Sequence, residues 1–139
     1  MMDTAPALGQ FNVDVATCRQ SLMAREEKKR ARREQRRQAA LEAAINAITS
    51  IVPRYPTVRR AYLFGSVSRQ GAFRIESDID IAVEGVDTPD YFPLWRDLEE
   101  AMPGWAVDLR ELVPGSDFAR RVQERGQLVY ERKDSDLES

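Results

Sequence analysis

The chain has 139 residues, of which 42% are hydrophobic and 32% charged, and its formal net charge is -2. This length and composition predict a single globular domain with one modest core. Cys18 is the only cysteine and histidine is absent, which excludes internal disulfides, Ser-His-Asp triads and ordinary zinc sites and leaves carboxylates, hydroxyls, lysine and arginine to carry any chemistry.

The N-terminal third predicts one long helix. Residues 1–16 mix Pro, Gly, Thr and Asp without periodicity, and we expect them to be flexible. Residues 17–52 contain no Gly or Pro and consist mainly of good helix formers. In the second half of this helix, Leu41, Ile45, Ile48 and Val52 recur at helical spacing and predict an apolar stripe that packs on a core.

The first half of the predicted helix is strongly basic. Residues 25–37 hold eight Lys or Arg and three Glu, a net +5, so the rest of the chain carries -7. With almost no apolar residue, this run should project into solvent or onto a partner. A solvated helix with ion pairs along its surface is the default interpretation. The positive electrostatic potential of residues 25–37 could also attract RNA or an acidic protein surface. We favour a protein partner, because the acidic remainder repels phosphate backbones.

The remaining elements alternate between strands and helices. Pro53 and Pro56 end the long helix. Strands are predicted at residues 60–64, 78–84, 105–111 and 127–131, helices at 88–102 and 116–125, and a flexible tail at 133–139. This order predicts an α/β (α+β) domain over residues 53–132, with a small mixed sheet flanked by helices.

Two further expectations concern packing and location. Phe92, Trp95, Leu98 and Trp105 are interpreted as residues that pack in the core or against a partner, not as a platform for stacking bases. The sequence has no apolar run of about 18 residues and no signal-peptide layout at its N-terminus, so we expect no membrane segment and a cytoplasmic location.

The segment Ser77-Asp78-Ile79-Asp80-Ile81-Ala82-Val83 carries the chemistry. Side chains alternate along a strand, so Asp78 and Asp80 should share one face while the apolar residues occupy the other. Two carboxylates so close repel each other unless a divalent cation joins them, and Mg²⁺ prefers such hard oxygen ligands. Asp108 lies between Val107 and Leu109 in another predicted strand. If the two strands are neighbours, three carboxylates converge and could hold two metal ions.

A phosphate-binding turn precedes this segment. Gly65-Ser66 follows the strand at residues 60–64 directly. Glycine allows close approach of the backbone, while the amides of a following helix and the Ser66 hydroxyl could bind a triphosphate. Arg69 is placed either to contact phosphate or simply to add surface charge. Alone, each motif is common; in the order strand, turn, helix, strand, followed by Asp108, the set is specific.

These residues resemble the DNA polymerase β-like nucleotidyltransferase superfamily, and more narrowly its minimal MNT branch, which pairs with HEPN-domain toxins. The resemblance covers residues 58–132 and depends on Gly65-Ser66, Ser77-Asp78-Ile79-Asp80 and Val107-Asp108-Leu109. It departs from small relatives at Gln70, which separates Arg69 from Gly71, and in the long basic helix.

The resemblance implies a nucleotidyltransferase. Asp78, Asp80 and Asp108 would be its catalytic and metal-binding residues, holding two Mg²⁺ ions, and Gly65, Ser66, Arg69 and Ser77 would bind the nucleotide. It further implies an antitoxin that transfers AMP from ATP to a tyrosine of a HEPN toxin. Two alternatives stay open: an antitoxin that neutralises by binding alone, and nucleotidyl transfer to a small molecule or an RNA end. The sequence makes no prediction about homo-oligomers.

Overall fold

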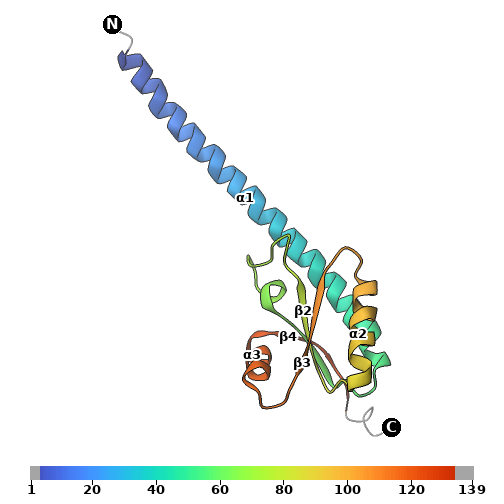
Figure 1. Cartoon of the computed structure of the whole chain (residues 1–139). Coiled ribbons are helices and arrows are strands. Elements are labelled where there is room, and N and C mark those ends of the chain that lie inside the picture. Colours follow the sequence, from blue (N-terminus) through green and yellow to red (C-terminus); the bar gives the residue numbers. More distant parts are fainter. Residues whose placement is uncertain (1–3, 134–139) are drawn as a thin grey trace.

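The computed structural model describes the backbone of residues 4–133 and the side chains of residues 14–133. A mixed four-stranded sheet with the order β3-β2-β1-β4 forms the body of the molecule (Figure 1). In chain order the elements are α1 (Thr4–Ile51), η1 (Val52–Arg54), β1 (Arg60–Phe64), η2 (Gly65–Ser68), β2 (Ile79–Glu84), α2 (Thr88–Ala101), β3 (Val107–Leu112), α3 (Asp117–Arg125) and β4 (Gln127–Glu131). The fold class predicted from the sequence is confirmed, and the strands and helices of the body begin and end within two residues of their predicted limits.

The two faces of the sheet are covered by different helices. Strand β1 runs antiparallel to β2 and β4, whereas β2 and β3 are parallel. Ile79, Ile81 and Val83 alternate along β2 and are fully buried in the main core, together with apolar residues of α1 and α2. On the other face, Tyr62 and Ala82 belong to a smaller cluster with α3. Helix α3 therefore lies on the opposite side of the sheet from α2, as Figure 1 shows.

Helix α1 begins earlier than predicted. It starts at Thr4, whereas the sequence predicted a helix only from residue 17. Residues 1–3 lie outside the described part of the chain, and the flexibility expected before residue 17 stays a prediction. Pro6 is compatible with this start, because proline in the first turn lacks only an N–H that has no helical partner there. A single glycine, Gly9, costs a helix only about 1 kcal/mol relative to alanine, and the rest of the segment continues the helix formers that follow.

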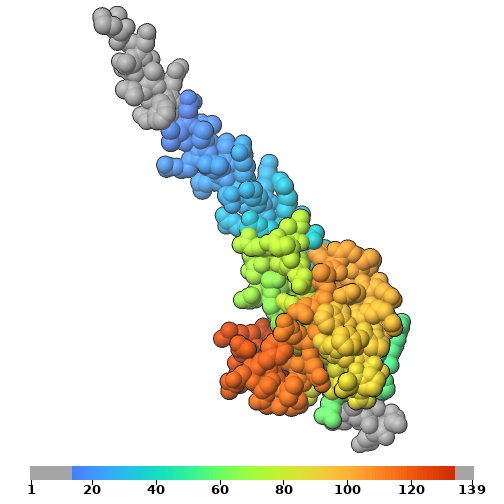
Figure 2. Space-filling view, viewed as in Figure 1, coloured from blue at the N-terminus to red at the C-terminus, as the bar shows by residue number. Residues whose placement is uncertain are grey.

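The first part of α1 extends away from the body as an arm (Figures 1 and 2). Every side chain from residue 14 to residue 32 is exposed. The predicted apolar stripe is confirmed further along, where Ala44, Ile48 and Val52 are fully buried and Leu41 and Ile45 pack on the core.

The basic run does not project into solvent over its whole length. The Arg36 guanidinium lies 4.5 Å from the centre of the Trp105 ring. Arg37 Nη1 donates to the Val67 carbonyl at 3.0 Å, and its side chain also pairs with Glu34. The long apolar stems and planar heads of these arginines explain how charged residues can pack here. Only the part of the run before about residue 33 behaves as predicted.

Removal of the arm should leave the body folded. We expect deletion of residues 1–31 to change the melting temperature by less than about 4 °C, because the described side chains of this stretch, residues 14–31, are all exposed, and loss of exposed groups changes stability by about 0.5 kcal/mol or less. Thermal unfolding followed by circular dichroism measures this. Deletion of residues 1–44, which removes buried Ala40 and Ala44, should lower the melting temperature strongly. A large loss from the shorter deletion would mean that the arm supports the body.

Within the described residues, no helix has both the length and the apolar character needed to cross a bilayer.

Candidate active site

Asp80 and Asp108 face each other across two neighbouring strands. The register of the parallel pair β2 and β3 aligns Asp80 with Asp108, and the antiparallel pair β1 and β2 aligns Phe64 with Asp80. Aligned residues of adjacent strands are about 5 Å apart and point to the same side of a sheet. Asp108, Asp80 and Phe64 therefore form one row on the face that carries α3. The two strands are therefore neighbours, which was the condition for their carboxylates to converge.

Asp78 lies at the edge of this row. It directly precedes β2 and is exposed, whereas Asp80 and Asp108 are half-buried. Burial, together with the negative charges of Asp108 and Asp78, raises the pKa of Asp80 to about 6. The carboxylates of Asp78 and Asp108 are therefore each close enough to disfavour the charged form of Asp80.

Bound cations would relieve this repulsion. The donor set consists of hard carboxylate oxygens on one open face, which suits Mg²⁺. In this conformation, however, no three His, Cys, Asp or Glu groups between residues 14 and 133 are arranged to hold a metal ion. Asp108 is drawn toward Arg110, whose Nε donates to it at 3.3 Å, and Asp78 is exposed. The residues fit the ion chemically, and both of these side chains would have to turn toward Asp80 to enclose it.

Gly65 packs directly against the central carboxylate. Its φ angle is +70°, and a Cβ atom built at this position would lie 2.2 Å from Asp80 Oδ2. Any other residue would therefore be strained and would also collide with Asp80. This contact joins the Gly65-Ser66 turn to the acidic row.

The other predicted nucleotide-binding residues lie around this turn. Ser66 is half-buried in η2, and its carbonyl accepts from the Arg69 amide at 3.2 Å. Arg69 is exposed at the end of η2. Ser77 has a structural contact instead. Its hydroxyl accepts a hydrogen bond from the Arg74 amide at 2.9 Å, which closes the loop that leads to Asp78. The structure thus brings Gly65 to Asp80 and gives Ser77 a structural contact.

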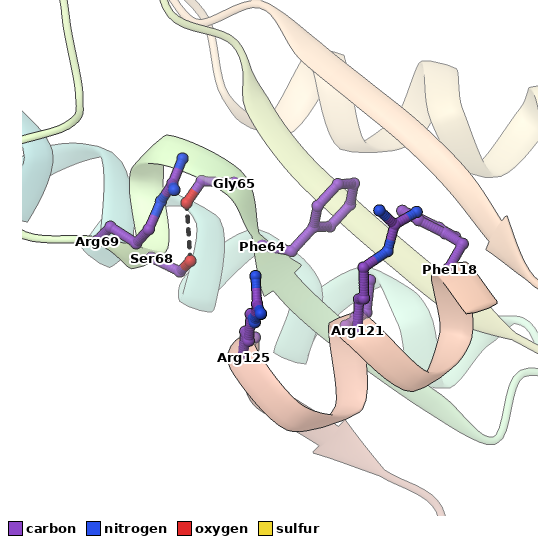
Figure 3. Close-up of a pocket in the computed structure, with 9 residues that line it drawn as sticks. Phe64, Gly65, Ser68, Arg69, Phe118, Arg121 and Arg125 are labelled. Carbon is purple, nitrogen blue, oxygen red and sulfur yellow. Dashed lines mark hydrogen bonds between the residues drawn. The ribbon is translucent and has the colours of Figure 1, made fainter.

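A pocket of about 310 Å³ opens beside the row, between the Gly65 turn and α3 (Figure 3). Phe64 and Phe118 form its floor, and Arg69, Arg121 and Arg125 line it. No sequence motif points to Arg121 or Arg125. Their spacing of four residues in a predicted helix places them on one face, but only the packing of α3 beside Gly65 reveals which face.

The tryptophans are packing residues, as predicted. Trp95 is half-buried against the core, and its indole N–H donates to the Val107 carbonyl at 2.9 Å. Trp105 contacts Phe73 at a centroid distance of 6.0 Å. Leu98 is fully buried, whereas Phe92 is 72% exposed and stacks on Trp95. Trp95 thus contacts the first residue of the strand that carries Asp108, and Trp105 lies just before this strand.

The part of the chain that holds this site matches a known protein family. The family model described as "Polymerase beta, Nucleotidyltransferase" matches residues 46–135. This span includes the whole sheet, the Gly65 turn and the three aspartates. No curated protein matches the chain.

Solved structures of toxin–antitoxin complexes are similar to the chain. A toxin–antitoxin with AMP-PNP is 30% identical over 66% of this chain and 77% of the other, with a TM-score of 0.53. The toxin–antitoxin MntA-HpeT, in a variant in which two aspartates separated by one residue are changed to glutamate, is 29% identical over 66% of this chain and 76% of the other, also with a TM-score of 0.53. A complex of a tri-AMPylated Shewanella oneidensis HEPN toxin with its MNT antitoxin gives 27% identity over 68% and 76%, with a TM-score of 0.49.

Proposed function

The chain belongs to the polymerase β nucleotidyltransferase family, and from this we propose that it is an antitoxin that transfers AMP from ATP to a tyrosine hydroxyl of a HEPN-type toxin. The observation that carries the proposal is the row of Asp80 and Asp108 with Gly65 packed against it. Similar solved structures support the partner and the nucleotide, since they are toxin–antitoxin complexes and one contains AMP-PNP, an ATP analogue.

The three aspartates would have different roles in the reaction. Asp78 and Asp80 would hold two Mg²⁺ ions, with Asp108 completing the site on the acceptor side. When bound, Mg²⁺ would lower the pKa of the acceptor hydroxyl and offset the charge of the phosphates. The tyrosine oxygen would form a bond to the α-phosphorus, the bond from this phosphorus to the bridging oxygen would break, and pyrophosphate would leave. Asp108 would accept the hydroxyl proton. Gly65, Ser66, Arg69 and Ser77 would bind the nucleotide.

The exposed arm would contact the protein partner. Residues 14–32 have no buried side chain, and a helix of this kind gains little stability without tertiary packing. Its positive charge suits an acidic partner surface. A cytoplasmic location stays a prediction, as does the preference for a protein over nucleic acid.

Neutralisation of the toxin distinguishes transfer from simple masking. We expect a variant with Asp78, Asp80 and Asp108 all changed to Asn to bind the HEPN protein but to lose protection of cells that express it. Growth assays and co-purification measure the two properties. Protection by a variant that cannot transfer AMP would establish masking instead, and labelling of RNA or of a small molecule such as an aminoglycoside in place of the protein would establish the second alternative.

A further inference from the structure

The pocket beside the acidic row gathers positive charge from two separate segments. Arg69 follows η2, whereas Arg121 and Arg125 lie one turn apart on α3, and the side chains of all three line the pocket (Figure 3). Within residues 14–133, none of them forms an ion pair. Arg120, on the same helix, instead pairs with Asp117 at 3.0 Å. Like charges one helical turn apart are destabilising, and a bound anion would remove that cost.

The floor of the pocket strengthens such an interaction. Phe64 and Phe118 meet edge to face, with ring centroids 5.3 Å apart, and buried Val122 lies beside them. An apolar floor keeps water away from one side of the pocket and lowers the local dielectric, so charge pairs there are stronger than on an open surface. Guanidinium groups match phosphate geometry through paired N–H donors. The chemistry of the pocket therefore suits phosphate groups.

The position of the pocket indicates which phosphates these are. Asp108, Asp80 and Phe64 follow one another across the sheet, and Gly65 both touches Asp80 and lines the pocket. In the proposed reaction the acceptor lies on the side of Asp108, and the pocket lies at the opposite end of the row. A nucleotide whose α-phosphorus sits near Asp80 would extend its other phosphates past Gly65 toward α3.

We propose that Arg121 and Arg125, together with Arg69, bind the β- and γ-phosphates of the nucleoside triphosphate and hold the pyrophosphate after transfer. This inference rests on the proposed nucleotidyltransferase reaction for its orientation, and it adds α3 to the substrate-binding surface. It makes the site specific for nucleotides that carry a polyphosphate tail.

Binding of inorganic tripolyphosphate tests the proposal without an acceptor protein. Isothermal titration calorimetry on the full chain should show that Arg121→Gln with Arg125→Gln weakens tripolyphosphate binding at least tenfold. Arg120→Gln is the control, because it removes an exposed arginine from the same helix but outside the pocket; its effect should be less than twofold. Affinity for AMP, which lacks the tail, should change less than twofold in both variants. Circular dichroism verifies that the exposed substitutions leave the fold intact.

The outcomes separate the pocket from the reaction. Equal tripolyphosphate affinity in the double variant and the Arg120 control would overturn the proposal, as would an equal loss of AMP affinity, which would assign the pocket to another part of the nucleotide. Arginine-dependent tripolyphosphate binding without any AMP transfer would support the pocket and overturn the proposed function. AMP transfer by a double variant whose affinity for ATP is unchanged would support the proposed function and overturn the role of the pocket.

Discussion

Replacement of Asp80 by asparagine should stabilise the folded protein at pH 8 while it abolishes nucleotidyl transfer. The folded-state pKa of Asp80 is about 6, against an ordinary value of 3.8, so the unfolded chain ionises first as the pH rises. The stability that protonated Asp80 contributes to the wild-type fold is therefore lost as the pH rises from about 4 to about 6. A shift of two units corresponds to about 3 kcal/mol, and solvent screening of this half-buried group reduces the expected gain to about 1–2 kcal/mol.

Urea unfolding at pH 4 and pH 8 measures this gain. The difference between Asp80→Asn and wild type should be small at pH 4 and large at pH 8, and Asp14→Asn on the exposed arm should show no such dependence. Transfer should fall about a thousandfold, because loss of a metal ligand removes several kcal/mol of transition-state stabilisation. Saturating Mg²⁺ with ATP should stabilise only the wild type. An asparagine variant that is less stable at pH 8 would contradict the electrostatic account of the row.

Substitution of Gly65 by alanine should cause the second large effect. The left-handed backbone costs an alanine about 1–2 kcal/mol, and its Cβ would lie 2.2 Å from Asp80 Oδ2, so the carboxylate must move. A displacement of about 1 Å in an active site can cost a hundredfold in rate. We expect transfer to fall at least about a hundredfold and the free energy of unfolding to fall by more than the backbone strain alone.

Gly104→Ala provides the control for backbone strain. Gly104 has a φ angle of +87° with no atom within 4 Å of a built Cβ, so this substitution imposes the strain without the collision. It should lower stability by about 1–2 kcal/mol and leave the transfer rate nearly unchanged. Similar rates for the two variants would mean that the Gly65 contact does not position Asp80.

The sequence could predict on which face of its strand each of Asp80 and Asp108 lies, because the alternation of side chains along a strand depends only on neighbouring residues. Alternation places Asp80 opposite Ile79 and Ile81, and Asp108 opposite Val107 and Leu109, without knowledge of the fold. That the two strands are neighbours was only a condition of the sequence argument, and their parallel register fulfils it. The detailed contact of Gly65 with Asp80 depends on how η2 folds back over β2, and no local pattern encodes this.

The errors of the sequence analysis come from tertiary contacts and from weak helix signals. Composition alone assigned Arg36 and Arg37 to solvent, but the loop after β1 and the Trp105 ring give them partners. Pro6 and Gly9 suggested a helix start only at residue 17, yet the helix includes both. The arginines of α3 were overlooked because a charged helix face is usually only solvated, and their meaning depends on the neighbouring turn.

The most direct test of the central claim is the intact mass of a HEPN-type partner after incubation with this chain, Mg²⁺ and ATP. The account predicts a gain of whole AMP units on the partner with the wild-type chain, fragment spectra that place them on tyrosine, and no gain with Asp80→Asn. An unchanged partner mass in a stable, neutralised complex would contradict the account and establish an antitoxin that acts by binding.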